Sequence, residues 1–175
     1  MFGRRLLFTL PLVLWLGLVF YFSSQPYQKQ TLIPWMQHHV SQKKLAELLP
    51  DWTLQYGKTR LNSKRSPFEF VEFVSRKLAH LFIYFMLGLL ACFALLPFLI
   101  PWIPRMLLAL LTLAAVALAD EWNQRLWLLR TGQLRDVGLD CAGGVVGVLA
   151  CMSAAIWYKR HRSGHLSRHD EVMTD

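Results

Sequence analysis

Four long apolar runs limit what this chain can fold into. Apolar side chains fill residues 6–22, 78–96, 101–122 and 141–158 almost completely. Each run is close to the roughly 20 residues that an α-helix needs to cross about 30 Å of hydrocarbon. Because unpaired backbone polar groups are too costly in lipid, runs of this length are expected to cross as helices. The sequence therefore predicts an all-α fold, an integral membrane bundle of four transmembrane helices.

The composition agrees with a membrane protein. Of the 175 residues, 54% are hydrophobic and only 17% are charged, whereas a soluble domain carries about 25% charged residues. We expect one transmembrane domain over residues 1–158 and a polar, basic, partly disordered tail at 159–175. The net charge of +8 lies in loops and tails, where it suits contact with the anionic headgroups of the lipid bilayer. We expect no nucleic-acid partner.

A long connection follows the first apolar run, which we interpret as an uncleaved helix because "YFSSQP" lacks a clean signal-peptide cleavage site. Residues 35–52 alternate apolar and basic side chains at roughly helical spacing, which predicts a short amphipathic helix on the membrane interface. Residues 55–66 read as loop. The order Ser66, Pro67, Glu69 predicts a helix start with a capping box, so the second spanning helix begins before the hydrocarbon.

Ionisable residues gather at one end of the predicted bundle. Four helices that cross the membrane in succession alternate in direction. The ends of the first and third helices therefore lie on the same side of the membrane as the starts of the second and fourth. Ser23 and Asp120 lie at this end, and groups at membrane depth are costly unless paired, so they suggest a functional site. The candidate ligand-binding residues are Lys77, His80, Tyr84, Glu121, Gln124, Arg130, Arg135, Asp136 and Asp140.

Spacing places several of these candidates on shared helix faces. Lys77, His80 and Tyr84 stand at i, i+3 and i+7, which is one stripe of a helix. In the fourth span, two acids are followed at helical spacing by glycines, which permit close helix contact. The candidate packing residues are Gly143, Gly144 and Gly147. The cysteines show no metal-ligand spacing, and we expect no metal ion and no cofactor.

Four motifs in order resemble the VanZ-like family, small bacterial membrane proteins named after a member associated with resistance to the glycopeptide antibiotic teicoplanin. The motifs are "FYFSSQP", "RKLAHLFIYFMLGLL", "DEWNQ" and "RTGQLRDVGLDCAGGVVG". They cover residues 20–149 apart from the long connection. The resemblance implies a cell-envelope role with a link to antibiotic tolerance, and it supplies no reaction.

The resemblance also assigns positions within the family's pattern. It matches the second-helix stripe, the acid and glutamine that end the third helix, the loop arginine and the acid that opens the fourth helix. Leu128 and Leu129 stand where the family loop usually carries Pro-Gly, which puts the turn geometry in doubt. The matching residues are Lys77, His80, Tyr84, Glu121, Gln124, Arg130 and Asp136, with Asp140 where asparagine is frequent.

Several functions remain open at this point. We expect a non-enzymatic protein whose polar cluster binds or masks an anionic lipid-linked cell-wall precursor, or the glycopeptide antibiotic itself, because guanidinium groups pair well with phosphate and carboxylate. An intramembrane metal- or acid/base-dependent hydrolase is the alternative, although no H-E-x-x-H or G-x-S-x-G pattern is present. A small transporter and a purely structural bundle complete the set, and a homo-oligomer is compatible with each.

The membrane and the orientation follow from the flanking charges. We expect the bacterial inner membrane with both termini cytoplasmic, because Arg4 and Arg5 precede the first span and Lys159 and Arg160 follow the fourth. A count of every basic residue favours the reverse orientation, since many basic residues lie in the long connection. The preference of basic residues for the cytoplasmic side is strongest, however, for charges next to a span.

This orientation predicts that the polar end faces outward. In a variant lacking Cys92, Cys141 and Cys151, a Thr131→Cys side chain should react with a membrane-impermeant maleimide in intact cells. A Ser163→Cys control should react only after permeabilisation. The opposite labelling pattern would reverse the orientation and weaken a role for envelope ligands.

Overall fold

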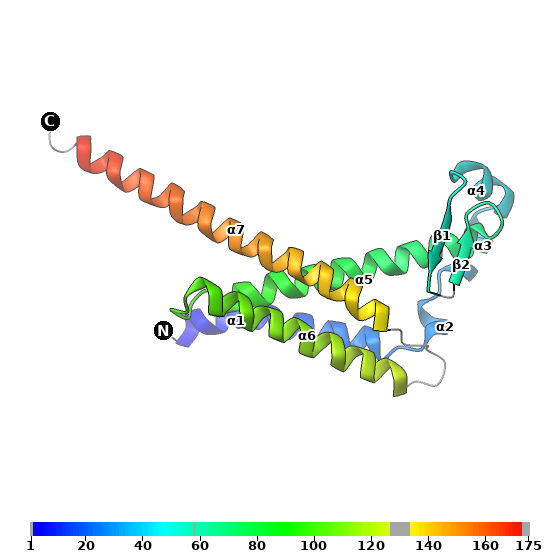
Figure 1. The fold of residues 1–175 in the computed structure, drawn as a ribbon, viewed down its shortest axis with the longest axis horizontal. Helices are drawn as coiled ribbons and strands as arrows, with labels where there is room; N and C mark the ends of the chain where they lie inside the picture. Colours follow the sequence, from blue (N-terminus) through cyan, green and yellow to red (C-terminus); the bar gives the residue numbers. More distant parts are fainter. Residues whose placement is uncertain (1, 58, 127–133, 173–175) are drawn as a thin grey trace.

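The computed structural model describes residues 2–57, 59–126 and 134–172. Four long helices form a bundle, and the shorter elements lie at one end of it (Figure 1). The elements are α1 (Phe2–Ser23), α2 (Tyr27–Gln30), α3 (Ile33–His39), α4 (Gln42–Leu48), β1 (Thr53–Tyr56), β2 (Thr59–Asn62), α5 (Pro67–Ala94), α6 (Trp102–Leu126) and α7 (Leu134–Val172). Helices α1, α5, α6 and α7 are long and apolar enough to cross a membrane, which confirms the predicted bundle.

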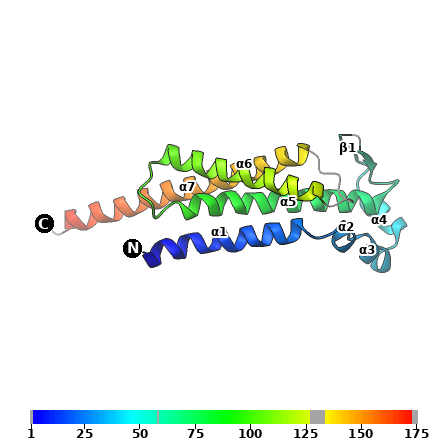
Figure 2. The same ribbon diagram turned by 90° about the horizontal axis from the view of Figure 1, so that it is seen from below.

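Helix α5 lies in the middle of the bundle and contacts α1, α6 and α7 (Figure 2). Its residues Tyr84, Leu87 and Cys92 are fully buried, and Leu113 of α6 and Val148 of α7 complete the centre of the core. Large apolar side chains on the outer faces of the same helices stay exposed, as expected where lipid covers them. The core therefore depends on α5, and the other three helices surround it.

Glycines bring α5 and α7 into backbone contact. A Cβ atom added at Gly88 of α5 would collide with the carbonyl oxygen of Gly144, and one added at Gly147 would collide with that of Phe85. At Gly143, it would lie 2.5 Å from the carbonyl oxygen of Leu81. Without a hydrophobic force between helices in lipid, such close approach is a main source of packing energy.

Helix α1 is attached to α5 by an indole and by ring stacking. The Trp15 indole nitrogen donates to the carbonyl oxygen of Ile83 at 3.0 Å, and the Phe8 and Phe93 rings stack with their centroids 4.5 Å apart. A hydrogen bond between helices replaces one that lipid cannot offer. These contacts hold the first and middle parts of α1 along the membrane-spanning part of α5.

The connection between α1 and α5 folds into a small cap, residues 27–66, whose α3, α4 and β2 contact α5. Strands β1 and β2 pair antiparallel from Thr53 opposite Asn62 to Tyr56 opposite Thr59. Gly57 begins the turn with φ 63°, a left-handed conformation that favours glycine. The loop predicted for 55–66 was therefore wrong, because it contains strand β2.

Two further details of the cap differ from the sequence predictions. The single amphipathic helix predicted for 35–52 was wrong, because the chain becomes extended at Val40 and divides it into α3 and α4. Helix α5 begins at Pro67 as predicted, but the Ser66 hydroxyl forms no capping hydrogen bond with the described residues. It points to the carbonyl oxygen of Asn62 at 3.4 Å instead.

Helix α7 continues past the predicted end of its span at Tyr158 and reaches Val172. Its 39 residues correspond to a length of roughly 58 Å, nearly twice the thickness of the hydrocarbon. Figure 1 shows this last part extending beyond the other three helices. The division into a domain at 1–158 and a partly disordered tail at 159–175 stays a prediction.

The glycine contacts predict opposite effects for two alanine substitutions in α7. Gly147→Ala should lower the free energy of unfolding by about 1–3 kcal/mol, because the methyl group forces the α5 and α7 backbones apart. Gly138→Ala should be neutral or stabilising, since a Cβ there meets nothing within 4 Å and alanine favours helix. Thermal unfolding in detergent measures both. Equal melting temperatures would contradict the backbone contact.

Candidate functional site

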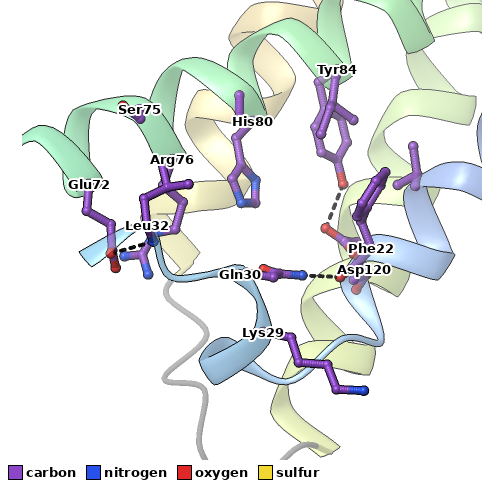
Figure 3. Close-up of a pocket in the computed structure, with 14 residues that line it drawn as sticks. Phe22, Lys29, Gln30, Leu32, Glu72, Ser75, Arg76, His80, Tyr84 and Asp120 are labelled. Atoms are coloured by element: carbon purple, nitrogen blue, oxygen red, sulfur yellow. Dashed lines mark hydrogen bonds between the residues drawn. The ribbon is translucent and has the colours of Figure 1, made fainter. Parts of the chain in front are cut away.

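One face of α5 presents four polar side chains at intervals of four residues. Glu72, Arg76, His80 and Tyr84 all line a cavity of about 430 Å³. They point from α5 toward the end of α1, the α2 segment and α6 (Figure 3). A spacing of four keeps side chains on one helix face, so this row forms the polar wall of the cavity.

Tyr84 and Asp120 join α5 to α6 at the deepest polar contact of the site. The tyrosine hydroxyl donates to the Asp120 carboxylate at 3.1 Å, and both residues are buried. A buried carboxylate is costly unless donors compensate its charge. This hydrogen bond therefore stabilises Asp120 in the cavity wall and fixes the position of α6 relative to α5.

His80 and Asp140 join α5 to α7. The Nδ1 atom of His80 lies 3.2 Å from an Asp140 oxygen, and Asp140 is only 4% exposed. The imidazole ring points into the cavity (Figure 3). Because the contact uses Nδ1, Nε2 is the ring nitrogen that can meet a group in the cavity. The pair orients the ring as a carboxylate does in acid–base sites.

Lys77, Asp136 and Tyr56 form a third contact, which lies beside the cavity. The Lys77 amine is 2.5 Å from Asp136 Oδ1, and the Tyr56 hydroxyl donates to the same oxygen at 2.8 Å. The amine also lies over the Tyr56 ring, 4.4 Å from its centroid, a favourable cation–π arrangement. This contact joins the cap to the start of α7.

The end of α1 is attached to α6 by an amide. Asn123 donates to the hydroxyl oxygens of Ser23 and Ser24, both at 3.1 Å. Glu121, two residues before Asn123 on α6, is buried but is not among the residues that line the cavity. The polar end of the bundle is thus held together by side-chain contacts between α5, α6, α7 and the end of α1.

The structure brings together part of the predicted set. His80 and Tyr84 line the cavity, whereas Lys77 faces the cap and α7. Asp136 and Asp140 pair with Lys77 and His80. The glycines at 143, 144 and 147 lie against α5 and α6. Arg130 and the side chains of Gln124 and Arg135 lie outside the described residues.

Sequence reasoning missed two residues of the polar row, Glu72 and Arg76. They precede the apolar run that begins at residue 78, so the search for intramembrane charges excluded them. The sequence did contain a signal for them, because Glu72 stands eight residues and Arg76 four residues before His80. Asp120 was placed at the correct end but not chosen as a candidate.

Chemically, the cavity combines cations, hydrogen-bonding groups and apolar walls. Lys29 and Arg76 supply positive charge, and Val19, Phe22 and Ile83 supply apolar surface. Among residues 2–57, 59–126 and 134–172, no group of three or more histidine, cysteine or acidic side chains is placed to hold a metal ion. The arrangement is suited to holding a molecule with a charged and an apolar part.

Comparison with known proteins identifies one family. The model of the family described as VanZ/LLP1 matches residues 8–158. No curated protein and no solved structure matches the chain. The matched range contains most or all of each of the four candidate spans, the cap and every residue that lines the cavity.

The buried contact between α5 and α6 gives a stability prediction. Tyr84→Phe should lower the free energy of unfolding by about 1–3 kcal/mol, because it removes a donor from a buried carboxylate. Tyr21→Phe is the matched control, since Tyr21 is 63% exposed and should change stability little. Thermal unfolding of both variants in the same detergent is the measurement, and similar losses in the two would refute a specific role for the Tyr84 hydroxyl.

Proposed function

The chain belongs to the VanZ/LLP1 family, and we propose that its cavity binds the anionic head group of a lipid-linked component of the bacterial cell envelope. The four apolar helices make the protein a multi-pass membrane protein. The proposal places it in the inner membrane with both termini cytoplasmic and the cavity at the outer side. Its role there is to bind or mask the ligand.

The observation that carries the proposal is the mixed lining of the cavity. Arg76 and Lys29 offer positive charge beside the apolar side chains of Val19, Phe22 and Ile83. A lipid-linked phosphate needs both kinds of surface, one for the head group and one for the first part of the hydrocarbon chain. Guanidinium groups in particular match phosphate oxygens with two parallel hydrogen bonds.

Two acids also line the cavity, and their contacts reduce the repulsion of an anion. Glu72 accepts hydrogen bonds from the segment at residues 31–33, and Asp120 accepts one from Tyr84. Donors of this kind compensate part of a buried carboxylate's charge. The proposal therefore gives the acids a role mainly in positioning the wall and assigns binding of the anion to Arg76 and Lys29.

In this proposal, the ligand enters the cavity from the bilayer. Phe22, at the end of α1, lines the cavity and is 48% exposed, and Leu32 lines it and is 46% exposed. Side chains that are both lining and exposed mark the mouth. Because Phe22 lies in the last turn of a helix long and apolar enough to span a membrane, the proposal puts the mouth at the level of the lipid head groups.

The size of the cavity favours a lipid-linked ligand over the antibiotic. A glycopeptide antibiotic is too large for a space of about 430 Å³, which is within the range that holds drug-sized molecules. An influence on glycopeptide susceptibility would then come from binding or masking the lipid-linked precursor that the antibiotic recognises.

A second function, hydrolysis of a lipid-linked substrate, is favoured by the contact of His80 with Asp140. A histidine held by a carboxylate, with its other nitrogen toward a cavity, is the usual arrangement of a general base. It could activate water against a phosphate ester held by Arg76. Binding remains the first proposal, because it needs only the cavity and its lining.

Binding of farnesyl phosphate, a short lipid-linked phosphate, tests the first proposal. Purified protein in detergent should bind it more tightly than farnesol, which lacks the phosphate, or inorganic phosphate, which lacks the hydrocarbon chain. Arg76→Gln should weaken binding about tenfold or more, as expected for a lost charge-assisted hydrogen bond. Fluorescence or calorimetric titration gives the dissociation constants.

The matched control is Arg65→Gln, since Arg65 is exposed in the cap and does not line the cavity. Equal binding of farnesyl phosphate and farnesol, or equal losses in the two arginine variants, would reject the binding proposal. Release of inorganic phosphate in the same mixtures, abolished by His80→Gln, would instead place hydrolysis first. If farnesyl phosphate is unchanged after long incubation, binding remains the proposed function.

A further inference from the structure

One wall of the cavity comes from outside the transmembrane helices. Residues 27–33, here called the strap, comprise α2 and the link to α3. Lys29, Gln30 and Leu32 of the strap line the cavity, opposite the polar row of α5 (Figure 3). Without the strap at this position, the cavity would be open along this side.

One carboxylate oxygen accepts three hydrogen bonds from the strap. Oε2 of Glu72 accepts hydrogen bonds from the Thr31 hydroxyl at 2.5 Å, from the Leu32 amide at 3.1 Å and from the Ile33 amide at 3.2 Å. Glu72 is only 7% exposed. Hydrogen bonds to an ionised acceptor are about twice as strong as neutral ones, so this group is the main attachment of the strap to α5.

The strap is also attached to α1 by a weaker contact. The Gln30 amide donates to the carbonyl oxygen of Phe22, a neutral hydrogen bond at the end of α1. Lys29 and Leu32 stay exposed, so they add little buried apolar area. Segments with few buried apolar contacts open at low free-energy cost. The position of the strap therefore depends on Glu72 more than on packing.

We propose that Glu72 is a positioning residue for the cavity, which holds the strap where Gln30 and Leu32 complete the wall and thereby sets which amphiphile the cavity admits. The part concerning the ligand rests on the proposed function. The attachment of the strap does not, since it follows from the contacts of Glu72 alone.

The first experiment measures the strap without a ligand. A spin label at Gln28→Cys, in a variant lacking the three native cysteines, reports motion of an exposed strap position outside the cavity lining. Glu72→Ala should make the label clearly more mobile. Glu69→Ala is the matched control, because Glu69 lies one turn earlier on α5 and is exposed. Equal label mobility in the two variants would overturn the proposal.

The second experiment measures the consequence for binding. Glu72→Ala should weaken binding of farnesyl phosphate about tenfold and reduce its preference over farnesol, whereas Glu69→Ala should retain both. Thr31→Val, which removes one donor and leaves the carboxylate, should give smaller changes in the same direction. It also replaces Glu72→Ala if that variant fails to fold, as judged by its thermal unfolding.

The two readouts separate the possible failures. A mobile label in Glu72→Ala, with no binding of farnesyl phosphate by the unmodified protein, would reject the proposed ligand and support the attachment. Normal binding with a mobile label would overturn the inference that the strap sets admission. Loss of both rigidity and selectivity in Glu72→Ala, with neither lost in Glu69→Ala, supports the whole proposal.

Discussion

The close approach of α5 and α7 determines the arrangement of the polar end. The two helices run in the same direction, so their contacts advance together along the chain: Lys77 with Asp136, His80 with Asp140, and then Gly88 with Gly144. In lipid, helices associate through packing and hydrogen bonds rather than through exclusion of water. The glycine contacts allow the backbones to meet, and this closeness brings two acids of α7 within reach of α5.

Helix α5 serves both as the centre of the core and as the wall of the candidate site. After Tyr84, the helix is apolar and supplies buried residues of the core. From Glu72 to Tyr84, it carries the polar row that faces the cavity. Helices α6 and α7 supply acids that meet this row or its flank. A change in the tilt or rotation of α5 would therefore alter the core and the cavity at once.

Length and hydropathy were sufficient to predict the four spanning helices, and the Ser66-Pro67 signal was sufficient to place the start of α5. The rotation of α5 was not predictable, because stripes through Lys77 and through Arg76 both satisfy helical spacing with His80 and Tyr84. The contact of Lys77 with Tyr56 decides between them. The hairpin was missed because its strands have only four residues each and neither alternates between buried and exposed positions, so the sequence lacked the hydrophobic alternation of a strand.

The contact between Tyr56, Lys77 and Asp136 has a consequence for the biogenesis of the protein. Helices enter the membrane in chain order, and Asp136 belongs to the last of them. Until α7 is inserted, Lys77 and His80 lack their carboxylate partners. Ionisable groups near lipid are costly without such partners. Insertion of the final helix therefore completes the polar end, and a chain that stops before α7 would present this unpaired charge to the quality control of the membrane.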